Sequence, residues 1–211
     1  SARPRALRRR DGSARLQVSC AAMDLRYATA PILVGHYEQD PITGAEAIID
    51  RDVVGNELTM RQHLGLYPGP IGTAAAVLVD ANEEERQRGS QRGALVAGLG
   101  KYGELTVVSL TEAVRAAALR SLLSVVERRG AVGTAARADE PPIEIELASL
   151  LLGQNSTANI GVADSVHALV RGVLEANRQF DQAQQRGVKA RIVRLEIIER
   201  YLDLAVSATR A

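Results

Sequence analysis

Short apolar runs alternate along this chain with longer stretches in which apolar residues recur at helical spacing. Strands covered on both faces are apolar almost throughout, so these runs predict buried strands. They occupy 16–25, 30–39, 74–80, 94–100, 143–153 and 188–198. The stretches between them predict helices, which begin near Ala45 and Thr59 and cover 106–129, 162–185 and 199–210. The alternation predicts an α/β domain whose sheet is mostly parallel and covered by helices on both faces.

The stretch 106–129 has the clearest helical pattern in the sequence. Its apolar residues fall on one face of the predicted helix, as they do in helices that pack on a core. They are Leu110, Val114, Ala117, Ala118, Leu122 and Val125. We therefore expect Ala117 and Leu122 to lie on the buried face.

The chain of 211 residues is long enough for one substantial core. We expect a single domain over 16–211, preceded by a basic tail or linker over 1–15. That tail should be flexible, because it carries many like charges and few apolar residues. Its arginines are Arg3, Arg5, Arg8, Arg9, Arg10 and Arg15.

Charge and composition argue against several partners. The net charge is +1 and aromatic residues make up 3% of the chain, so neither a basic field nor base-stacking platforms point to nucleic acid. No apolar run approaches the roughly 18 residues of a membrane helix, so we expect no membrane partner. Cys20 is the only cysteine, which excludes an internal disulfide and fits a cytoplasmic protein.

The turn Gly98-Leu99-Gly100-Lys101 lacks the pattern of a phosphate-binding loop. Such a loop needs two glycines four residues apart, followed by lysine and a hydroxyl residue, so that several backbone N–H groups converge on the phosphates. Here Lys101 is followed by Tyr102. We interpret the turn as the sharp connection between a strand and a helix, where glycine is needed.

The histidines and the first acidic cluster also have ordinary explanations. His36, His63 and His167 lie in different predicted elements and none has metal-ligand spacing, so each is interpreted as structural or exposed. Glu46 and Asp50 lie one helical turn apart, with Asp52 nearby. This cluster is interpreted as a solvated acidic face in preference to an acid–base pair. The residues thus predict no catalytic and no metal site.

The loop from Gly153 to Ser165 is the strongest candidate for a ligand site. It leaves a buried strand and enters a helix, and the free N–H groups and dipole of a helix N-terminus favour an anion. Backbone N–H groups near Asn159, Ile160 and Gly161 would be the donors. The alternative is a surface loop that ends in a helix cap at Asp164 or Ser165.

Two stretches, 34–79 and 92–122, resemble the N-terminal domain of the leucyl aminopeptidase (cytosol aminopeptidase) family. The shared features are a Gly-Ala helix start with a following aspartate, glycine turns, and a "GLGK" turn before an alanine-rich helix. Here they are Gly44 to Ala47, Asp50, Gly55, Gly69 to Gly72 and Val96 to Thr106. The resemblance covers roughly 31–127, with weaker agreement at 145–153.

This resemblance implies a macro-domain-like fold, a three-layer α/β/α sandwich with a mostly parallel, mixed sheet. In that family the domain helps assembly and regulation, whereas two metal ions and an "NTDAEGR" motif perform the chemistry in a separate C-terminal domain. The motif does not occur in this sequence. The resemblance therefore implies a chain that is not an enzyme and needs no cofactor.

The chain also has the pattern "VGHY…DPI.GAE…LGLYPGP.GT" over 34–73. In this it resembles sequences that occur beside caspase-like CHAT peptidase domains in bacteria. This implies a regulatory or assembly module of a larger bacterial peptidase-type protein. Its partners would be the other domains of that protein or a second copy of the chain. The alternative is a macro-like domain that binds ADP-ribose or another nucleotide at the carboxyl ends of its strands.

Overall fold

The computed structural model describes residues 15–79, 91–131, 141–154, 160–183 and 189–211. They form a six-stranded sheet in the order β1-β6-β5-β2-β4-β3. The strands are β1 (Gln17–Ala22), β2 (Ile32–His36), β3 (Ala74–Leu78), β4 (Gly93–Gly98), β5 (Ile143–Ser149) and β6 (Ala190–Glu199). All neighbouring strands are parallel except β3, which runs antiparallel to β4 at one edge. The predicted mixed, mostly parallel α/β fold is confirmed.

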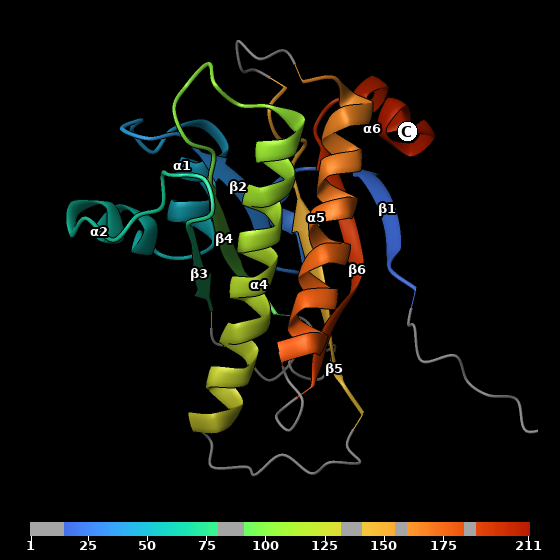
Figure 1. The fold of residues 1–211 in the computed structure, drawn as a ribbon. Coiled ribbons are helices and arrows are strands. Elements are labelled where there is room, and N and C mark those ends of the chain that lie inside the picture. The colour runs from blue at the N-terminus through green and yellow to red at the C-terminus, as the bar shows by residue number, and fades with distance from the viewer. Residues whose placement is uncertain (1–14, 80–90, 132–140, 155–159, 184–188) are drawn as a thin grey trace, which may run out of the picture.

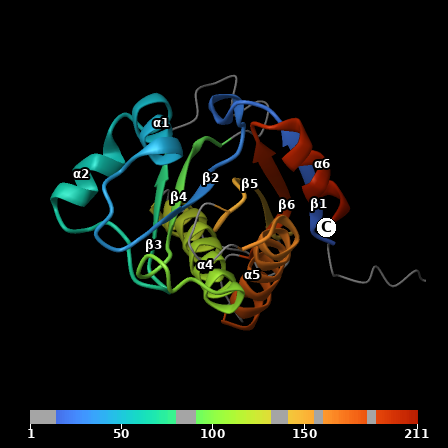
Figure 2. The same cartoon turned by 90° about the horizontal axis from the view of Figure 1, so that it is seen from above.

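Helices cover both faces of the sheet and form the two outer layers of the sandwich (Figures 1 and 2). The long helices α4 (Val107–Ala131) and α5 (Val162–Ala183) lie side by side on one face. The other face carries α1 (Gly44–Asp52), with α2 (Glu57–His63) beyond it, and the short 3-10 helix η1 (Leu25–Tyr27). The closing helix α6 (Leu202–Arg210) packs on β1 and β6 beside α5. Within the described residues, no helix is both long and apolar enough to cross a bilayer.

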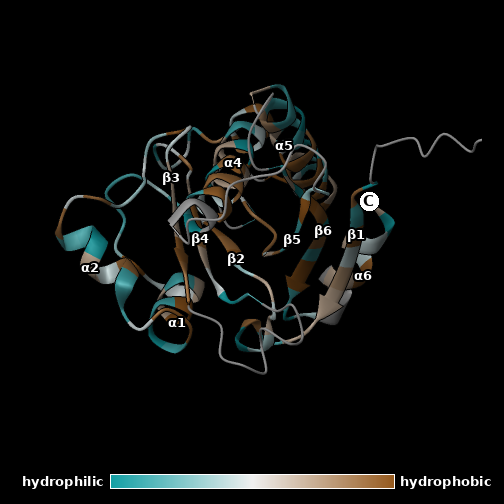
Figure 3. Ribbon diagram, turned by 90° about the horizontal axis from the view of Figure 1, so that it is seen from below, coloured by the Kyte–Doolittle hydropathy of each residue, from teal (hydrophilic) through white to brown (hydrophobic). Residues whose placement is uncertain are grey.

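The sheet separates two apolar clusters, and the hydropathy colours of Figure 3 show brown strands between them. The larger cluster lies under α4 and α5, and the smaller one under α1, α2 and η1. Ala117 and Leu122 of α4 are fully buried in the larger cluster, as predicted. β4 is buried along its whole length, because helices cover both its faces and strands flank both its edges.

Some boundaries differ from the predicted ones. β6 continues to Glu199, so the closing helix begins at Leu202, later than the sequence pattern indicates. The helix predicted to begin near Thr59 begins at Glu57. Cys20 is half-buried, since β1 is an edge strand. The predicted flexible tail falls almost entirely outside the described residues.

Candidate functional site

The carboxyl ends of β2, β4 and β5 meet at one edge of the sheet, because these strands are parallel. Ligands of open α/β sheets bind at this edge. The described ends of the loop from Gly153 to Ser165 lie between the central strand β5 and the start of α5 at Val162. The predicted connection from a buried strand to a helix is therefore present, and whether the loop binds a ligand stays a prediction.

The three residues predicted to bind a ligand have different surroundings. Asn159 lies outside the described residues. Ile160 is buried with a relative exposure of 5%, and its carbonyl accepts a hydrogen bond from Nε2 of Gln154 at 2.9 Å. Gly161 is exposed immediately before the first turn of α5. Of the two described positions, only Gly161 presents its backbone to solvent.

Apolar side chains pack against two glycines near these strand ends. Leu99 lies across β2, since a Cβ atom placed on Gly35 would be 2.5 Å from Leu99 Cδ1. A Cβ atom on Gly153 would be 2.9 Å from Ile160 Cδ1 and 3.3 Å from Leu105 Cδ2. We call Leu99, Leu105 and Ile160 the apolar plug. All three are buried and belong to the larger core cluster. Gly35 and Gly153 therefore leave room for side chains of the core.

The N-terminus of α5 already has an acidic residue beside it. Asp164 lies in the first turn of the helix, where its negative charge complements the helix dipole. Its Oδ2 atom would be 3.8 Å from a Cβ atom placed on Gly161. A phosphate that approached Gly161 would therefore meet a carboxylate as well as the helix N-terminus.

A buried polar cluster lies at the end of β2, on the side of the sheet covered by α1. Oε2 of Glu46, on α1, is hydrogen-bonded to Nδ1 of His36 at 3.1 Å. Its Oε1 accepts a hydrogen bond from the Tyr67 hydroxyl at 2.8 Å. The rings of His36 and Tyr67 meet edge to face with their centroids 4.6 Å apart. We call these three residues the Glu46 cluster. Both oxygens of its buried carboxylate are satisfied, as burial of a charge requires.

The surroundings of Tyr67 change its acidity. Burial raises the pKa of its hydroxyl well above the ordinary value, and the nearby negative charge of Glu46 raises this pKa further. The neutral hydroxyl therefore persists and keeps donating to Glu46. This arrangement rigidifies the connection between β2, α1 and the segment before β3.

His36 and Tyr67 also line an open cavity of about 330 Å³. A His–Glu pair can act as a base for a nucleophile, which would be Ser, Thr, Cys or Lys. The cavity lining, all of it within the described residues, contains none of these side chains. It consists of His36, Glu38, Gln39, Asp40, Gln62, Gly65, Tyr67, Pro68, Gly69 and Pro70.

The interpretation of Glu46 and Asp50 as a solvated acidic face is wrong. Their relative exposures are 9% and 3%. Asp50 accepts hydrogen bonds from the backbone N–H groups of Leu58 and Thr59 and from the Thr59 hydroxyl. It thus caps the first turn of α2 from a different helix. Helical spacing alone placed these carboxylates on one face but did not tell whether that face met solvent or protein.

The other candidates agree with their ordinary explanations. His63 and His167 are exposed on α2 and α5, whereas His36 is buried. In the described part of the chain, no three His, Cys, Asp or Glu side chains come together to hold a metal.

The "GLGK" turn is a structural connection between β4 and α4. A Cβ atom on Gly98 would be 2.2 Å from the Pro70 carbonyl oxygen, and Gly100 has a φ of 73°. The N–H of Gly100 donates to the carbonyl of Gly69 at 2.8 Å. Glycine is required here for close contact with the segment before β3, and Lys101 is exposed.

No family model and no curated protein matches this sequence. Solved structures do share its fold at low sequence identity. A tomato leucine aminopeptidase mutant has a TM-score of 0.53 and 13% identity over 92% of this chain and 35% of its own. A Trypanosoma brucei macrodomain in complex with ADP has a TM-score of 0.50 and 9% identity over 93% of this chain and 68% of its own.

An alphavirus structure, P23pro-zbd, has a TM-score of 0.49 and 11% identity over 95% of this chain, which spans only 24% of the viral chain. The likenesses to the macrodomain and to the aminopeptidase, with the mixed sheet described above, show that the chain has a macro-like α/β fold. The expected likeness to the aminopeptidase N-terminal region is thereby supported at the level of the fold.

Proposed function

We propose that this chain is a non-catalytic regulatory or assembly module of a larger bacterial, cytoplasmic, peptidase-type protein. Its partners are the other domains of that protein or a second copy of the chain, and neither nucleic acid nor membrane. The observation that carries this proposal is the apolar plug over the strand ends. Side chains of the core pack close to the strand ends among the described residues, and this supports a surface for protein contacts.

The plug is costly to displace. Complete burial of a leucine or isoleucine side chain contributes about 1.5–3 kcal/mol. Leu99, Leu105 and Ile160 are all nearly fully buried, so a ligand that replaced them at the strand ends would forfeit this stabilisation. The Glu46 cluster likewise fits a structural role, because both carboxylate oxygens are engaged within the protein.

A second candidate function is the binding of ADP-ribose or another nucleotide. The observation in its favour is the exposed Gly161 at the N-terminus of a long helix, where backbone N–H groups favour phosphate. The Trypanosoma macrodomain with ADP has a comparable fold. Asp164 and the apolar plug weigh against this candidate.

Isothermal titration calorimetry with ADP-ribose and ADP distinguishes the two functions. We expect no binding tighter than about 1 mM, equivalent to roughly 4 kcal/mol. Asp164→Asn tests whether the carboxylate repels phosphate, because it removes the charge and keeps the shape of the side chain.

Gly161→Val is the matched variant for the nucleotide candidate. Among the described residues, a Cβ atom on Gly161 would meet Asp164 Oδ2 at 3.8 Å, an ordinary van der Waals contact, and a thermal melt of the variant checks that it folds. Micromolar affinity in the wild type that weakens with salt and disappears in Gly161→Val would reverse the order of the two functions.

A further inference from the structure

The outer edge of β3 presents a row of backbone groups that do not bond to β4. Among the described residues, β3 is the last strand of the sheet and pairs only with β4. In this antiparallel ladder Val79 donates to Arg92 and Gly98 donates to Thr73, so odd-numbered residues of β3 bond to β4. The N–H and C=O groups of Ala74, Ala76 and Leu78 therefore point away from β4. An extended segment of about five residues, at roughly 3.4 Å per residue, would span this row.

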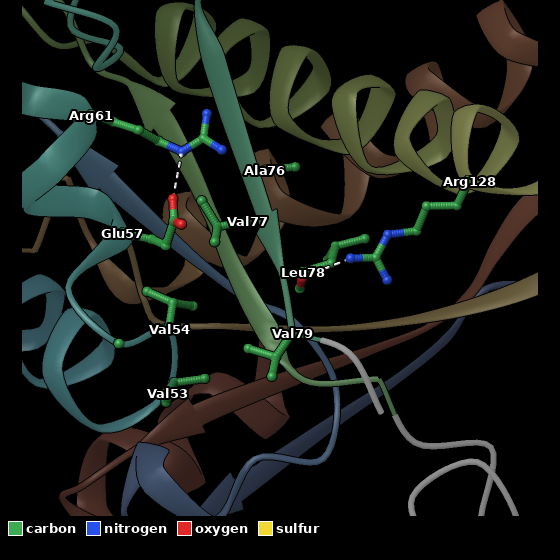
Figure 4. A pocket seen from close by; sticks show the side chains of 10 residues that line it. Val53, Val54, Glu57, Arg61, Ala76, Val77, Leu78, Val79 and Arg128 are labelled. Carbon is green, nitrogen blue, oxygen red and sulfur yellow. Dashed lines mark hydrogen bonds and ion pairs between the residues drawn. The ribbon is translucent and has the colours of Figure 1, made fainter. Parts of the chain in front are cut away.

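A groove of about 530 Å³ runs beside this edge (Figure 4). Valines form much of its wall, on the side of α1 and on β3 itself. They are Val53, Val54, Val77 and Val79. Alternate side chains of a strand point to opposite faces, so every second residue of an added strand would enter this groove.

Two guanidinium groups approach the groove from opposite sides, as Figure 4 shows. The Nε–H of Arg61 is buried and has no hydrogen-bond acceptor among the described residues. Arg61 forms an ion pair with the Glu57 carboxylate one helical turn away, but the 3.7 Å between Nε and Oε2 is beyond hydrogen-bonding distance. Nη2 of Arg128 donates to the outward carbonyl of Leu78 at 2.6 Å, and thus marks the end of the open row. The groove walls carry these two arginines and one carboxylate, Glu57.

We propose that β3 binds an extended acidic peptide segment of a partner protein by strand addition. Ala74, Ala76 and the Leu78 N–H supply the backbone hydrogen bonds, which give affinity in this mode of recognition. An acidic side chain of the peptide pairs with Arg61 and satisfies its buried Nε–H, while apolar side chains contact the valines. This inference rests on the proposed function, because it names the surface and partner through which the module acts.

The test uses a fluorescein-labelled peptide, SVEVEVS, titrated with the whole chain and followed by fluorescence anisotropy. We expect saturable binding that weakens with salt, since the charges are partly exposed. Two control peptides separate the contributions. SVQVQVS removes the charges and should bind about tenfold more weakly, and SVEPEVS should not bind, because proline removes a backbone donor and disfavours the added strand.

Variants of the chain locate the binding site. Arg61→Gln should weaken SVEVEVS about tenfold, whereas Arg171→Gln is its matched control. Arg171 also pairs with a glutamate one helical turn away, Glu175, but it lies on α5. Ala76→Pro should abolish binding and keep the fold, because edge strands tolerate proline where the N–H points outward. Should Ala76→Pro fail to fold, Arg61→Gln and the peptide controls still decide the outcome.

Three results would overturn the inference. The first is the absence of saturable binding, and the second is equal binding of SVEVEVS and SVQVQVS. The third is a wild-type affinity in both Arg61→Gln and Ala76→Pro, which would move the site elsewhere. In the first case, a dimer of the chain that Ala76→Pro converts to a monomer would identify a second copy of the chain as the occupant in place of the peptide. Tight nucleotide binding would instead contradict the proposed function and leave the groove experiment intact.

Discussion

At the scale of single residues, the most informative group is the buried carboxylate of Glu46. A carboxylate removed from water is tolerated only when hydrogen bonds replace its hydration. His36 and Tyr67 supply them from β2 and from the segment before β3, which are far apart in the sequence. The Glu46 cluster therefore connects α1 to the sheet through polar contacts beneath an otherwise apolar layer.

Tyr67→Phe should destabilise the protein and change how its stability depends on pH. At neutral pH the loss of a hydrogen bond to a charged group costs about 1.5–3 kcal/mol. Burial and Glu46 raise the pKa of Tyr67 above its ordinary value in the folded chain. The unfolded chain releases this proton near pH 10 while the folded chain keeps it. The stability due to Tyr67 is thus complete below about pH 10 and falls above it, by up to about 1.4 kcal/mol per pH unit.

Urea unfolding at about pH 8 and about pH 10.5 measures this dependence. The wild type should lose more stability between these two pH values than Tyr67→Phe. Tyr27→Phe is the control, because Tyr27 is 74% exposed and should behave as the wild type. Equal losses in the wild type and in Tyr67→Phe would mean that Tyr67 titrates in the folded protein as it does in the unfolded chain.

At the scale of elements, α4 contrasts a buried and an exposed leucine at adjacent positions. Leu122 is fully buried, whereas the side chain of Leu123 is 41% exposed. α4 also packs closely on α5, where a Cβ atom on Gly172 would be only 2.7 Å from Val114 Cγ1. The burial of this helix therefore has a sharp boundary between its two faces.

Leu122→Asp should destabilise the protein by about 4 kcal/mol or more, because an unpaired charge would enter the apolar core. Leu123→Asp makes the same chemical change one residue later and should cost less than about 1 kcal/mol. The midpoints of chemical denaturation compare the two variants directly. Similar midpoints would show that the orientation of α4 differs from the one described.

At the scale of the whole molecule, the chain has a macro-like fold and spans 35% of the tomato aminopeptidase chain that shares this fold. The "NTDAEGR" motif that carries the metal chemistry of the aminopeptidase family does not occur in the sequence. What the chain shares with the tomato aminopeptidase is the fold.

We expect no aminopeptidase activity from this chain, with or without added zinc or manganese. Two-metal catalysis in that family needs the metal ligands around the "NTDAEGR" motif, which does not occur in this sequence. Release of p-nitroaniline from leucine p-nitroanilide measures this, with a complete leucyl aminopeptidase as the positive control. Metal-dependent activity that persists through a second purification would contradict the expectation.

The sequence by itself determined the class of fold and the inner face of its longest helix. Alternating apolar runs and helical stretches predicted the strands and helices, because burial on two faces and on one face produce different periodicities. Leu122 and Ala117 could be assigned to the core for the same reason. The start of the closing helix was less clear, since Glu199 and Arg200 suit either a strand end or a helix start.

Only the tertiary structure decided what the polar residues and the strand edges meet. Glu46 and Asp50 have the same spacing in sequence whether they face water or protein, and their partners Tyr67, Leu58 and Thr59 come from later segments. The antiparallel edge position of β3 likewise depends on the path of the chain between strands. The apolar plug depends on glycines in β2 and after β5 that lie opposite distant side chains. Such contacts arise from long-range packing, which local periodicity does not encode.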